Sequence, residues 1–261
     1  LEGAMKPIII LTGPTAAGKT ALATMLADEF PVSLINADSQ QVYRGMDIGT
    51  AKLPPNELAN YPHALIDIRD PEQAYSVSEF VADASAAIKK AHQANRWPLL
   101  VGGTPLYLRA ILYGLDPLPS ADPEVRGRLQ QEASQKGWEN LHARLRRIDP
   151  ELSRKIRVTD RQRIQRALEI HELTGRPPSS LMTYNRRPRY RSHRLVVTPK
   201  DRNILHQRIT QRFDIMLEQG FLDEMHRLMS RPGLCANDSA MKSVGYRQAW
   251  AYLENAQSNI E

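Results

Sequence analysis

The residues with the clearest chemical meaning form a glycine-rich segment near the N-terminus. The segment is Gly13-Pro14-Thr15-Ala16-Ala17-Gly18-Lys19-Thr20. It matches G-x-x-x-x-G-K-[ST] and lies between an apolar run and a helix-like stretch, the context in which such a segment cradles phosphates. Backbone N–H groups and Lys19 attract the anion there, and the Thr20 hydroxyl can ligate Mg²⁺. A turn that binds nothing is the alternative, and the flanking strand and helix argue against it. The segment predicts a phosphate-bearing ligand without saying which.

An acidic residue follows a second apolar run. Asp38 comes shortly after residues 32–35, and open α/β sheets place their chemistry at the carboxyl ends of strands. Asp38 could therefore complete a magnesium shell or act as a general base, or it could only cap the next turn. Asp67 lies within another apolar run and is interpreted as structural or as a residue that supports those of the site from behind.

Four short apolar runs must position these residues. They are 7–11, 32–35, 64–68 and 98–101, each rich in Ile, Leu or Val. Runs of this kind are typical of strands buried on both faces, and the helix-like stretches between them predict a mainly parallel sheet. One of these stretches opens with a capping box, Ser76 to Glu79, and is predicted to continue as a helix to about Asn95. The sequence therefore predicts an α/β core.

The character of the chain changes after residue 119. Short polar helices are predicted over 122–136, 138–148, 150–156 and 160–174. No strand is predicted between residues 120 and 185. We therefore expect a P-loop-containing parallel-sheet core, residues 5–119 and 190–261, with an inserted all-helical module at 120–189. Residues 195–198 are expected to return to the sheet, followed by helices near 200–219 and 221–230, and residues 1–4 are interpreted as a cloning remnant.

Composition narrows the class of protein. The chain has 261 residues, of which 41% are hydrophobic and 25% charged, which excludes a chain disordered throughout. Its longest apolar runs are far shorter than the roughly 18 residues that a membrane span needs. The single Cys235 excludes an internal disulfide framework and a cysteine metal cluster, so we expect a cytoplasmic protein. A net charge of +6 is weak evidence for an anionic partner.

Five further segments, together with the phosphate loop, resemble the tRNA dimethylallyltransferase family, also called tRNA isopentenyltransferases. They are 36–52 (NADSQQVYRGMDIGTAK), 65–68 (LIDI), 101–108 (VGGTPLYL), 160–169 (DRQRIQRALE) and 244–248 (VGYRQ). Their order and spacing match over nearly the whole chain. Ala17 replaces a serine that is usual in the family's phosphate loop, and family members continue beyond the position of Glu261 with a basic segment.

The resemblance implies a tRNA-modifying enzyme. It would transfer a dimethylallyl group from dimethylallyl diphosphate to N6 of the adenosine next to the anticodon, tRNA position 37, and release diphosphate. Residues 13–20 would hold the diphosphate with Mg²⁺, ligated by Thr20, and Arg212 would supply a further cation. Asp38 would accept the proton from N6, and Thr104 would line the reaction channel and touch the adenine. Without the resemblance, Arg212 fits a solvated helix face shared with Arg202 and Arg208, and Thr104 fits a capping role.

The resemblance also implies that the helical insert reads the tRNA anticodon stem-loop. Candidate contacts are Asp38, Ser39, Gln40, Gln41, Thr104, Arg126, Gln162, Arg163, Ile164, Gln165, Arg166, Lys242, Ser243, Val244, Gly245, Tyr246 and Arg247. The arginines at 186, 187, 189, 191 and 194 are expected to meet phosphates. Judged from the residues alone, the insert carries an ordinary solvated basic face.

Two other functions compete with this one. A P-loop kinase that phosphorylates a small metabolite would explain residues 13–20 equally well, but it leaves the helical insert and the run 38–52 without a purpose. A nucleotide-gated RNA-binding module would explain the charge and the insert, but it does not explain the acid and the threonine at strand ends. We expect a monomer, because one tRNA offers one target base, and no membrane partner.

Overall fold

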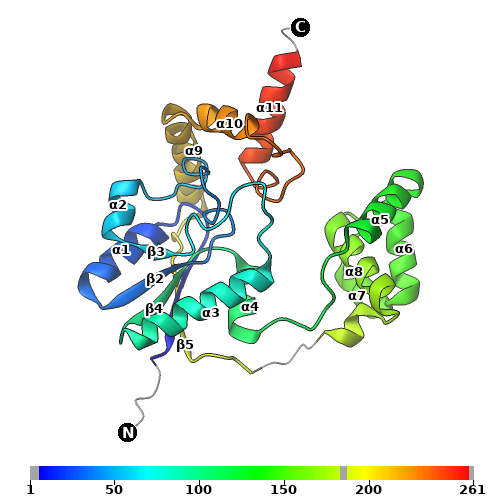
Figure 1. The fold of residues 1–261 in the computed structure, drawn as a ribbon, viewed down its shortest axis with the longest axis horizontal. Coiled ribbons are helices and arrows are strands. Elements are labelled where there is room, and N and C mark those ends of the chain that lie inside the picture. Colours follow the sequence, from blue (N-terminus) through cyan, green and yellow to red (C-terminus); the bar gives the residue numbers. More distant parts are fainter. Residues whose placement is uncertain (1–5, 183–186, 259–261) are drawn as a thin grey trace. The chain divides into compact units, whose positions relative to one another are not determined.

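A computed structural model of the chain describes residues 6–182 and 187–258 (Figure 1). The chain divides into two compact units. One, here called the core unit, comprises Leu1–Gly114 and Pro188–Glu261, and the other, the helical unit, comprises Leu115–Arg187. The supposed cloning remnant, residues 1–4, and Arg186 of the basic stretch lie outside the described residues.

The core unit is built on a five-stranded parallel sheet. Its strands are β1 (Ile8–Thr12), β2 (Val32–Asn36), β3 (His63–Ala64), β4 (Trp97–Val101) and β5 (Ser192–Val196). They lie in the order β3-β2-β4-β1-β5, and each neighbouring pair is parallel. The register sets Ile9 of β1 opposite Leu99 of β4 and His193 of β5. The predicted parallel sheet is therefore confirmed, and the runs of Ile, Leu and Val form its buried centre.

Two of the predicted strands differ from the structure. Only His63 and Ala64 pair with β2, whereas the sequence predicts a strand over 64–68. Leu65 and Asp67 have φ angles of 69° and 54°, in the left-handed region, so the chain turns there and leaves the sheet. The last strand begins earlier than predicted and ends at Val196. The left-handed residues make the first of these predictions wrong, because a strand cannot continue through them.

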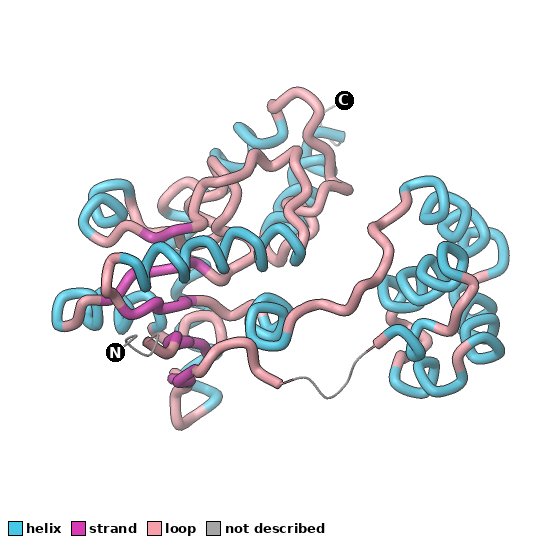
Figure 2. Tube along the Cα trace, turned by 60° about the horizontal axis from the view of Figure 1, so that its bottom comes forward, coloured by secondary structure: helices cyan, strands magenta, loops and turns pink. Residues whose placement is uncertain are grey.

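Helices pack on both faces of this sheet (Figures 1 and 2). The helices of the core unit are α1 (Lys19–Glu29), α2 (Pro55–Asn60), α3 (Val77–Gln93), α4 (Pro105–Tyr113), α9 (Arg202–Glu218), α10 (Phe221–Met229) and α11 (Tyr246–Ser258). Of these, α1 and α3 pack against the strands, from opposite faces. The Ser76–Glu79 capping box opens α3 as predicted, with Glu79 Oε2 accepting from Ser76 N at 2.8 Å and Ser76 Oγ accepting from Glu79 N at 3.2 Å. The sequence analysis did not predict α2, α4 and α11.

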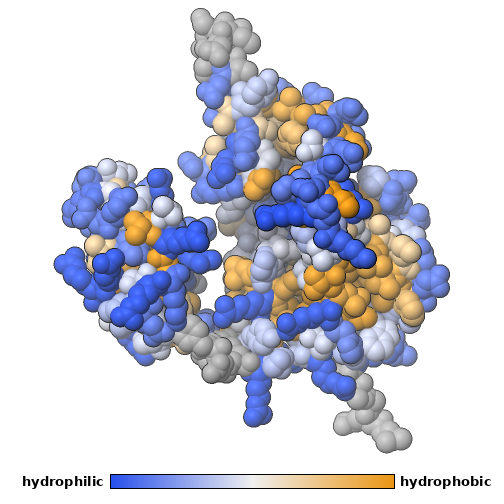
Figure 3. All heavy atoms as spheres, turned by 180° about the vertical axis from the view of Figure 1, so that it is seen from behind, coloured by the Kyte–Doolittle hydropathy of each residue, from blue (hydrophilic) through white to orange (hydrophobic). Residues whose placement is uncertain are grey.

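Two hydrophobic clusters, one on each face, fix the sheet between these helices. On one face, Ile10 and Leu100 pack with Phe80 and Ile88 of α3. On the other, Leu34 and Leu99 pack with Ala23 of α1. The β5 edge is less covered: Val196 is 65% exposed, and apolar side chains gather on the surface of the core unit (Figure 3).

The helical unit consists of α5 (Pro123–Lys136), α6 (Trp138–Ile148), α7 (Pro150–Lys155), α8 (Arg161–Thr174) and the short 3₁₀ helix η1 (Pro178–Leu181). Figure 2 shows these helices and their connecting loops. Asp122, Asp149 and Asp160 cap α5, α7 and α8 through their side chains, as the positions of these acids indicate. A separate hydrophobic core, which includes Leu141 and Leu168, holds the helices together. Within the described ranges, no helix of either unit is long and apolar enough to span a bilayer.

Candidate active site

Three neighbouring strands bring the candidate residues to one edge of the sheet. In the order β2-β4-β1, the carboxyl ends lead into Asp38, into Gly102-Gly103-Thr104, and into the phosphate loop. A Cβ added to Gly102 would lie 2.3 Å from the backbone of Ala37, so only glycine lets the end of β4 approach β2 this closely. The topology thus places Asp38, Thr104 and the loop at the same edge of the sheet, where open α/β sheets bind their ligands.

The phosphate loop is shaped to receive an anion. Gly18 adopts a left-handed φ of 95° and opens α1 without a side-chain cap, and the first turn carries no acidic residue. The N–H groups of that turn are therefore available to a ligand, and the helix dipole favours negative charge. Lys19 folds back over the loop, and its Nζ donates to the carbonyls of Gly13 at 3.0 Å and Pro14 at 2.8 Å. Burial lowers the pKa of Lys19, while attraction to Asp38 opposes that shift.

Asp38 is held in place through its backbone. Asn36, which is 2% exposed, accepts from Asp38 N at 2.9 Å and donates to Asp38 O and to Leu65 O, both at 3.0 Å. One carboxylate oxygen, Oδ1, accepts from Gln40 N at 2.8 Å, so the turn-capping role open from the sequence is real. Within the described part of the chain, the other oxygen, Oδ2, accepts no hydrogen bond. The carboxylate can therefore cap its turn and still accept a proton.

Thr104 ties the ends of β4 and β2 together. Its Oγ1 accepts from Ser39 N at 3.1 Å and lies 3.5 Å from Ser39 Oγ. It stands at the N-cap of α4 but makes no side-chain capping bond to that helix. The hydroxyl is instead directed toward the segment that carries Asp38.

Arg212 differs from the other arginines of its helix. Arg202 and Arg208 are exposed, whereas Arg212 is partly buried and donates from Nη2 to Thr50 O at 3.4 Å. Burial lowers its pKa, and the nearby carboxylate of Asp38 opposes the shift. Repulsion by Arg212 also contributes to the lowered pKa of Lys19. Two cations and one carboxylate therefore lie close enough to interact electrostatically. A bound polyanion would offset the repulsion between the two cations.

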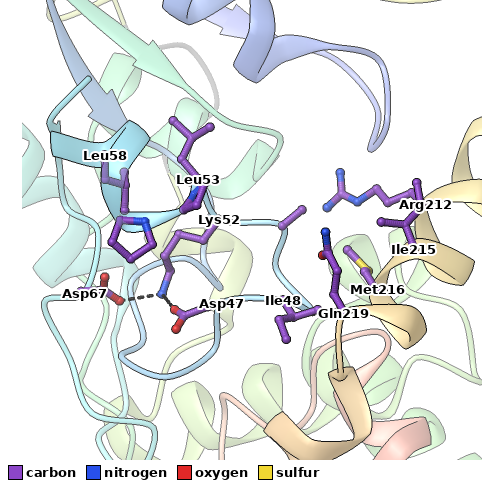
Figure 4. A pocket seen from close by; sticks show the side chains of 13 residues that line it. Asp47, Ile48, Lys52, Leu53, Leu58, Asp67, Arg212, Ile215, Met216 and Gln219 are labelled. Carbon is purple, nitrogen blue, oxygen red and sulfur yellow. Dashed lines mark hydrogen bonds and ion pairs between the residues drawn. The ribbon is translucent and has the colours of Figure 1, made fainter. Parts of the chain in front are cut away.

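A pocket of about 570 Å³ opens beside Arg212, whose guanidinium points into it from α9 (Figure 4). Its lining is mostly apolar and includes Ile48, Leu53, Leu58 and Met216. Apart from Arg212, the charged groups of the lining pair with one another. They are Lys52, whose Nζ lies 2.6 Å from both Asp47 Oδ1 and Asp67 Oδ1 and 2.9 Å from Tyr43 O, and the two carboxylates it binds. Asp67 therefore pairs with Lys52 at the edge of this pocket, which is compatible with both roles that the sequence leaves open.

Two of the residues predicted to contact tRNA are buried. Ile164 is fully buried in the core of the helical unit and Tyr246 is 1% exposed in the core unit. Their side chains are therefore not open to an RNA, and the predicted contacts at these two positions would have to use the backbone. The regular spacing of α8 already places Ile164 inward, whereas no local pattern reveals the burial of Tyr246. Its neighbours Lys242, Val244 and Arg247 are exposed.

Two other candidates in the helical unit are engaged by a buried acid. Glu169, which is fully buried, accepts from Arg126 Nε at 2.9 Å and from Arg166 Nη1 at 2.6 Å. Gln165 donates to the carbonyl of Arg126 at 3.1 Å. Sequence reasoning missed Glu169, although a Glu three residues after Arg166 on one helix is a recognisable signal. Gln162 and Arg163 remain exposed on the same helix.

The fold and this site define the chain as an α/β protein of the P-loop type, with an acid two strands away from the loop. Residues 41–261 match the model of a protein family described as IPP transferase. The chain belongs to this family.

Named relatives agree with this assignment. The chain is 50% identical over 251 residues to a tRNA dimethylallyltransferase of Nitrosococcus oceani, a match covering 95% of this chain and 80% of the relative. It is 53% identical over 249 residues to one of Alkalilimnicola ehrlichii, covering 95% and 78%. Among solved structures, the full-length tRNA isopentenylpyrophosphate transferase of Bacillus halodurans is 36% identical, with a TM-score of 0.65 and coverage of 97% and 78%. A eukaryotic dimethylallyltransferase acting on tRNA is 27% identical, with a TM-score of 0.75 and coverage of 97% and 65%.

Proposed function

We propose that this chain is a tRNA dimethylallyltransferase, which moves the dimethylallyl group of dimethylallyl diphosphate to N6 of the adenosine next to the anticodon. The relatives named above support the reaction class. The observation that carries the proposal is the common environment of Lys19, Arg212 and Asp38. Two cations suit a departing diphosphate, and a carboxylate beside them suits an amine that must lose a proton.

The phosphate loop, residues 13–20, holds the diphosphate in this proposal. Its free N–H groups, Lys19 and Arg212 neutralise the charge that develops on the leaving group, which is the dominant form of catalysis for such steps. The described residues contain no cluster of three His, Cys, Asp or Glu side chains that could hold a metal on its own. That fits Mg²⁺, which is commonly bound by one or two protein groups plus substrate phosphates. Thr20 would hold the ion, which supplies further charge neutralisation when bound.

Asp38 acts as the general base. A bond forms between N6 and C1, the bond between C1 and the diphosphate oxygen breaks with release of diphosphate, and Asp38 takes the proton that N6 loses. Asn36 hydrogen-bonds to the backbone of Asp38 and fixes its conformation, so the carboxylate is positioned before the substrate binds. Thr104 and the segment Ser39–Gln41 surround the adenine. The apolar pocket beside Arg212 suits a donor that is half hydrocarbon and half diphosphate.

The adenosine must leave its stack to reach these residues, which costs least in a single-stranded loop. The helical unit binds the anticodon stem-loop, mainly through exposed side chains of α8 such as Gln162 and Arg163. Lys242 and Arg247 of the core unit contribute further contacts, and the arginines at 187, 189 and 191 meet phosphates. The chain acts as a monomer, because one tRNA offers one target base. It acts in the cytoplasm.

A labelling experiment separates this function from its competitors. The chain is incubated with tRNA and either dimethylallyl diphosphate labelled in the prenyl group or ATP labelled in the γ-phosphate. Label that enters tRNA only from the prenyl donor, and is lost when the adenosine is replaced by guanosine, supports the proposal. Label transferred from ATP to a small metabolite would establish the kinase instead, and RNA retained without any transfer would establish the binding module.

A further inference from the structure

A buried carboxylate outside the proposed chemistry binds a loop of the site. Glu224 lies in the first turn of α10 and is 2% exposed. Its Oε2 accepts from the N–H groups of Asp47 at 2.9 Å and Ile48 at 2.7 Å. Its Oε1 accepts from Gly49 N at 3.2 Å and from the hydroxyl of Tyr246 at 2.6 Å. A buried charge is tolerated only when it is fully hydrogen-bonded, and four donors satisfy this one.

The loop held by Glu224 cannot shift independently of the helices behind it. A Cβ on Gly49 would lie 2.4 Å from the ring of Phe221 and 2.6 Å from that of Tyr246, so the backbone is pressed against both side chains. These rings meet edge to face, with centroids 5.2 Å apart. Burial and the carboxylate of Glu224 raise the pKa of Tyr246, which keeps its hydroxyl protonated as a donor. The helices α10 and α11 therefore fix residues 47–49.

The next residue of this loop connects it to the site. The carbonyl of Thr50 accepts from Arg212 Nη2 at 3.4 Å and from Gln41 Nε2 at 3.2 Å. Thr50 is itself buried, and its hydroxyl donates to Met46 O at 2.7 Å. Among the described residues, this carbonyl is the sole hydrogen-bond acceptor for the Arg212 side chain. The guanidinium of Arg212 would otherwise be free to sample other rotamers of a long side chain.

We infer that Glu224 is a positioning residue for the proposed reaction. It fixes residues 47–49, which set the Thr50 carbonyl. That carbonyl in turn holds the Arg212 guanidinium at the pocket into which it points. Tyr246, whose sequence motif suggested an RNA contact, belongs to the same hydrogen-bonded set. The inference rests on the proposed function only in that Arg212 is taken to bind diphosphate.

A double-mutant cycle tests this chain of contacts. The variants are Glu224→Gln, Arg212→Gln and the two combined, and the measurements are the Kd of inorganic diphosphate with Mg²⁺ and the KM values for both substrates. Gln keeps the shape of the side chain but removes its charge and replaces one acceptor oxygen by an N–H₂ group, which cannot accept from the N–H groups of the loop. We expect Arg212→Gln to weaken diphosphate about 100-fold and Glu224→Gln about 10-fold. The combined variant should be no weaker than Arg212→Gln, because residues that act through one another are not additive.

A matched control separates positioning from stability. Asp149→Asn makes the same change at a buried carboxylate of the helical unit, which accepts from Leu152 N and Ser179 N. It should lower the melting temperature and leave the diphosphate Kd unchanged. If Glu224→Gln behaves like this control, or if its loss multiplies with that of Arg212→Gln, the positioning role is refuted.

A second variant, Tyr246→Phe, tests the same contacts if the first one does not fold. If Glu224→Gln does not fold by circular dichroism, Tyr246→Phe replaces it, since it keeps the ring and removes one hydrogen bond. It should weaken diphosphate about 3-fold, and a wild-type Kd would overturn the inference. Because diphosphate binding is measured without tRNA, a wild-type chain that transfers no prenyl group refutes the proposed function alone.

Discussion

Replacing Asp38 by Asn separates proton removal from donor binding. Asn retains an oxygen that can accept from Gln40 N, and the bonds from Asn36 go to the backbone, so the turn should keep its shape. What disappears is the negative charge and the ability to take a proton. A general base contributes roughly 10²- to 10⁴-fold to a rate, so kcat should fall by that factor, about 3 to 5 kcal/mol in barrier height.

The same substitution should not weaken the donor. Asp38 attracts Lys19 and Arg212, as the direction of its effect on both pKa values indicates, and thereby competes with an incoming diphosphate. Removing its charge should leave the Kd of dimethylallyl diphosphate unchanged or tighter. Single-turnover transfer to tRNA gives the rate, and equilibrium titration with the donor gives the Kd. A parallel loss of rate and donor affinity would refute the base and favour a role for Asp38 in binding the metal.

Three further predictions concern other parts of the molecule. Burial lowers the pKa of Lys19, and only the charged form of its side chain attracts phosphate. As the pH is raised, kcat/KM for the donor should therefore begin to fall at a pH below the ordinary pKa of a lysine. Lys19→Arg should move this fall in kcat/KM to higher pH. Glu169→Gln should destabilise the helical unit by about 2 kcal/mol, because the charge-assisted hydrogen bonds from the partly exposed Arg126 and Arg166 are weakened, and hydrogen exchange over α5 and α8 would measure it. Neutralising the exposed arginines at 187, 189 and 191 should reduce the salt dependence of tRNA affinity by about 2 in log–log slope, and an unchanged slope would remove them from the interface.

Elements with a strong local signal were predictable from the sequence. The buried runs around β1, β2 and β4 pair as the apolar pattern requires. The helices that begin after Asp122, Asp149 and Asp160 start within a residue of their predicted positions, because a side-chain cap is a local device.

Elements decided by distant contacts were not predictable. The chain turns at Leu65 and Asp67 where Asn36 binds the carbonyl of Leu65 and Lys52 binds the carboxylate of Asp67. The local apolar pattern contains neither partner.

The helix α4, by contrast, could have been predicted. It begins with Pro105 at its first position, a recognisable signal that the sequence analysis did not use.

The candidate site shows the same division. The phosphate loop is a contiguous motif whose function follows from its own backbone, so the sequence alone identifies it. The bonds from Glu224 to residues 47–49 join positions about 175 residues apart, and only the fold brings them together. Tyr246 was therefore assigned to RNA from its motif, although its hydroxyl belongs to this buried set.

The most direct test of the central claim is a crystal structure with an unreactive analogue of dimethylallyl diphosphate. We predict that its phosphate oxygens lie about 3 Å from Lys19 Nζ and from the N–H groups that open α1, with C1 facing the carboxylate of Asp38. Phosphates bound elsewhere in the core unit, away from both Lys19 and Arg212, would contradict the account.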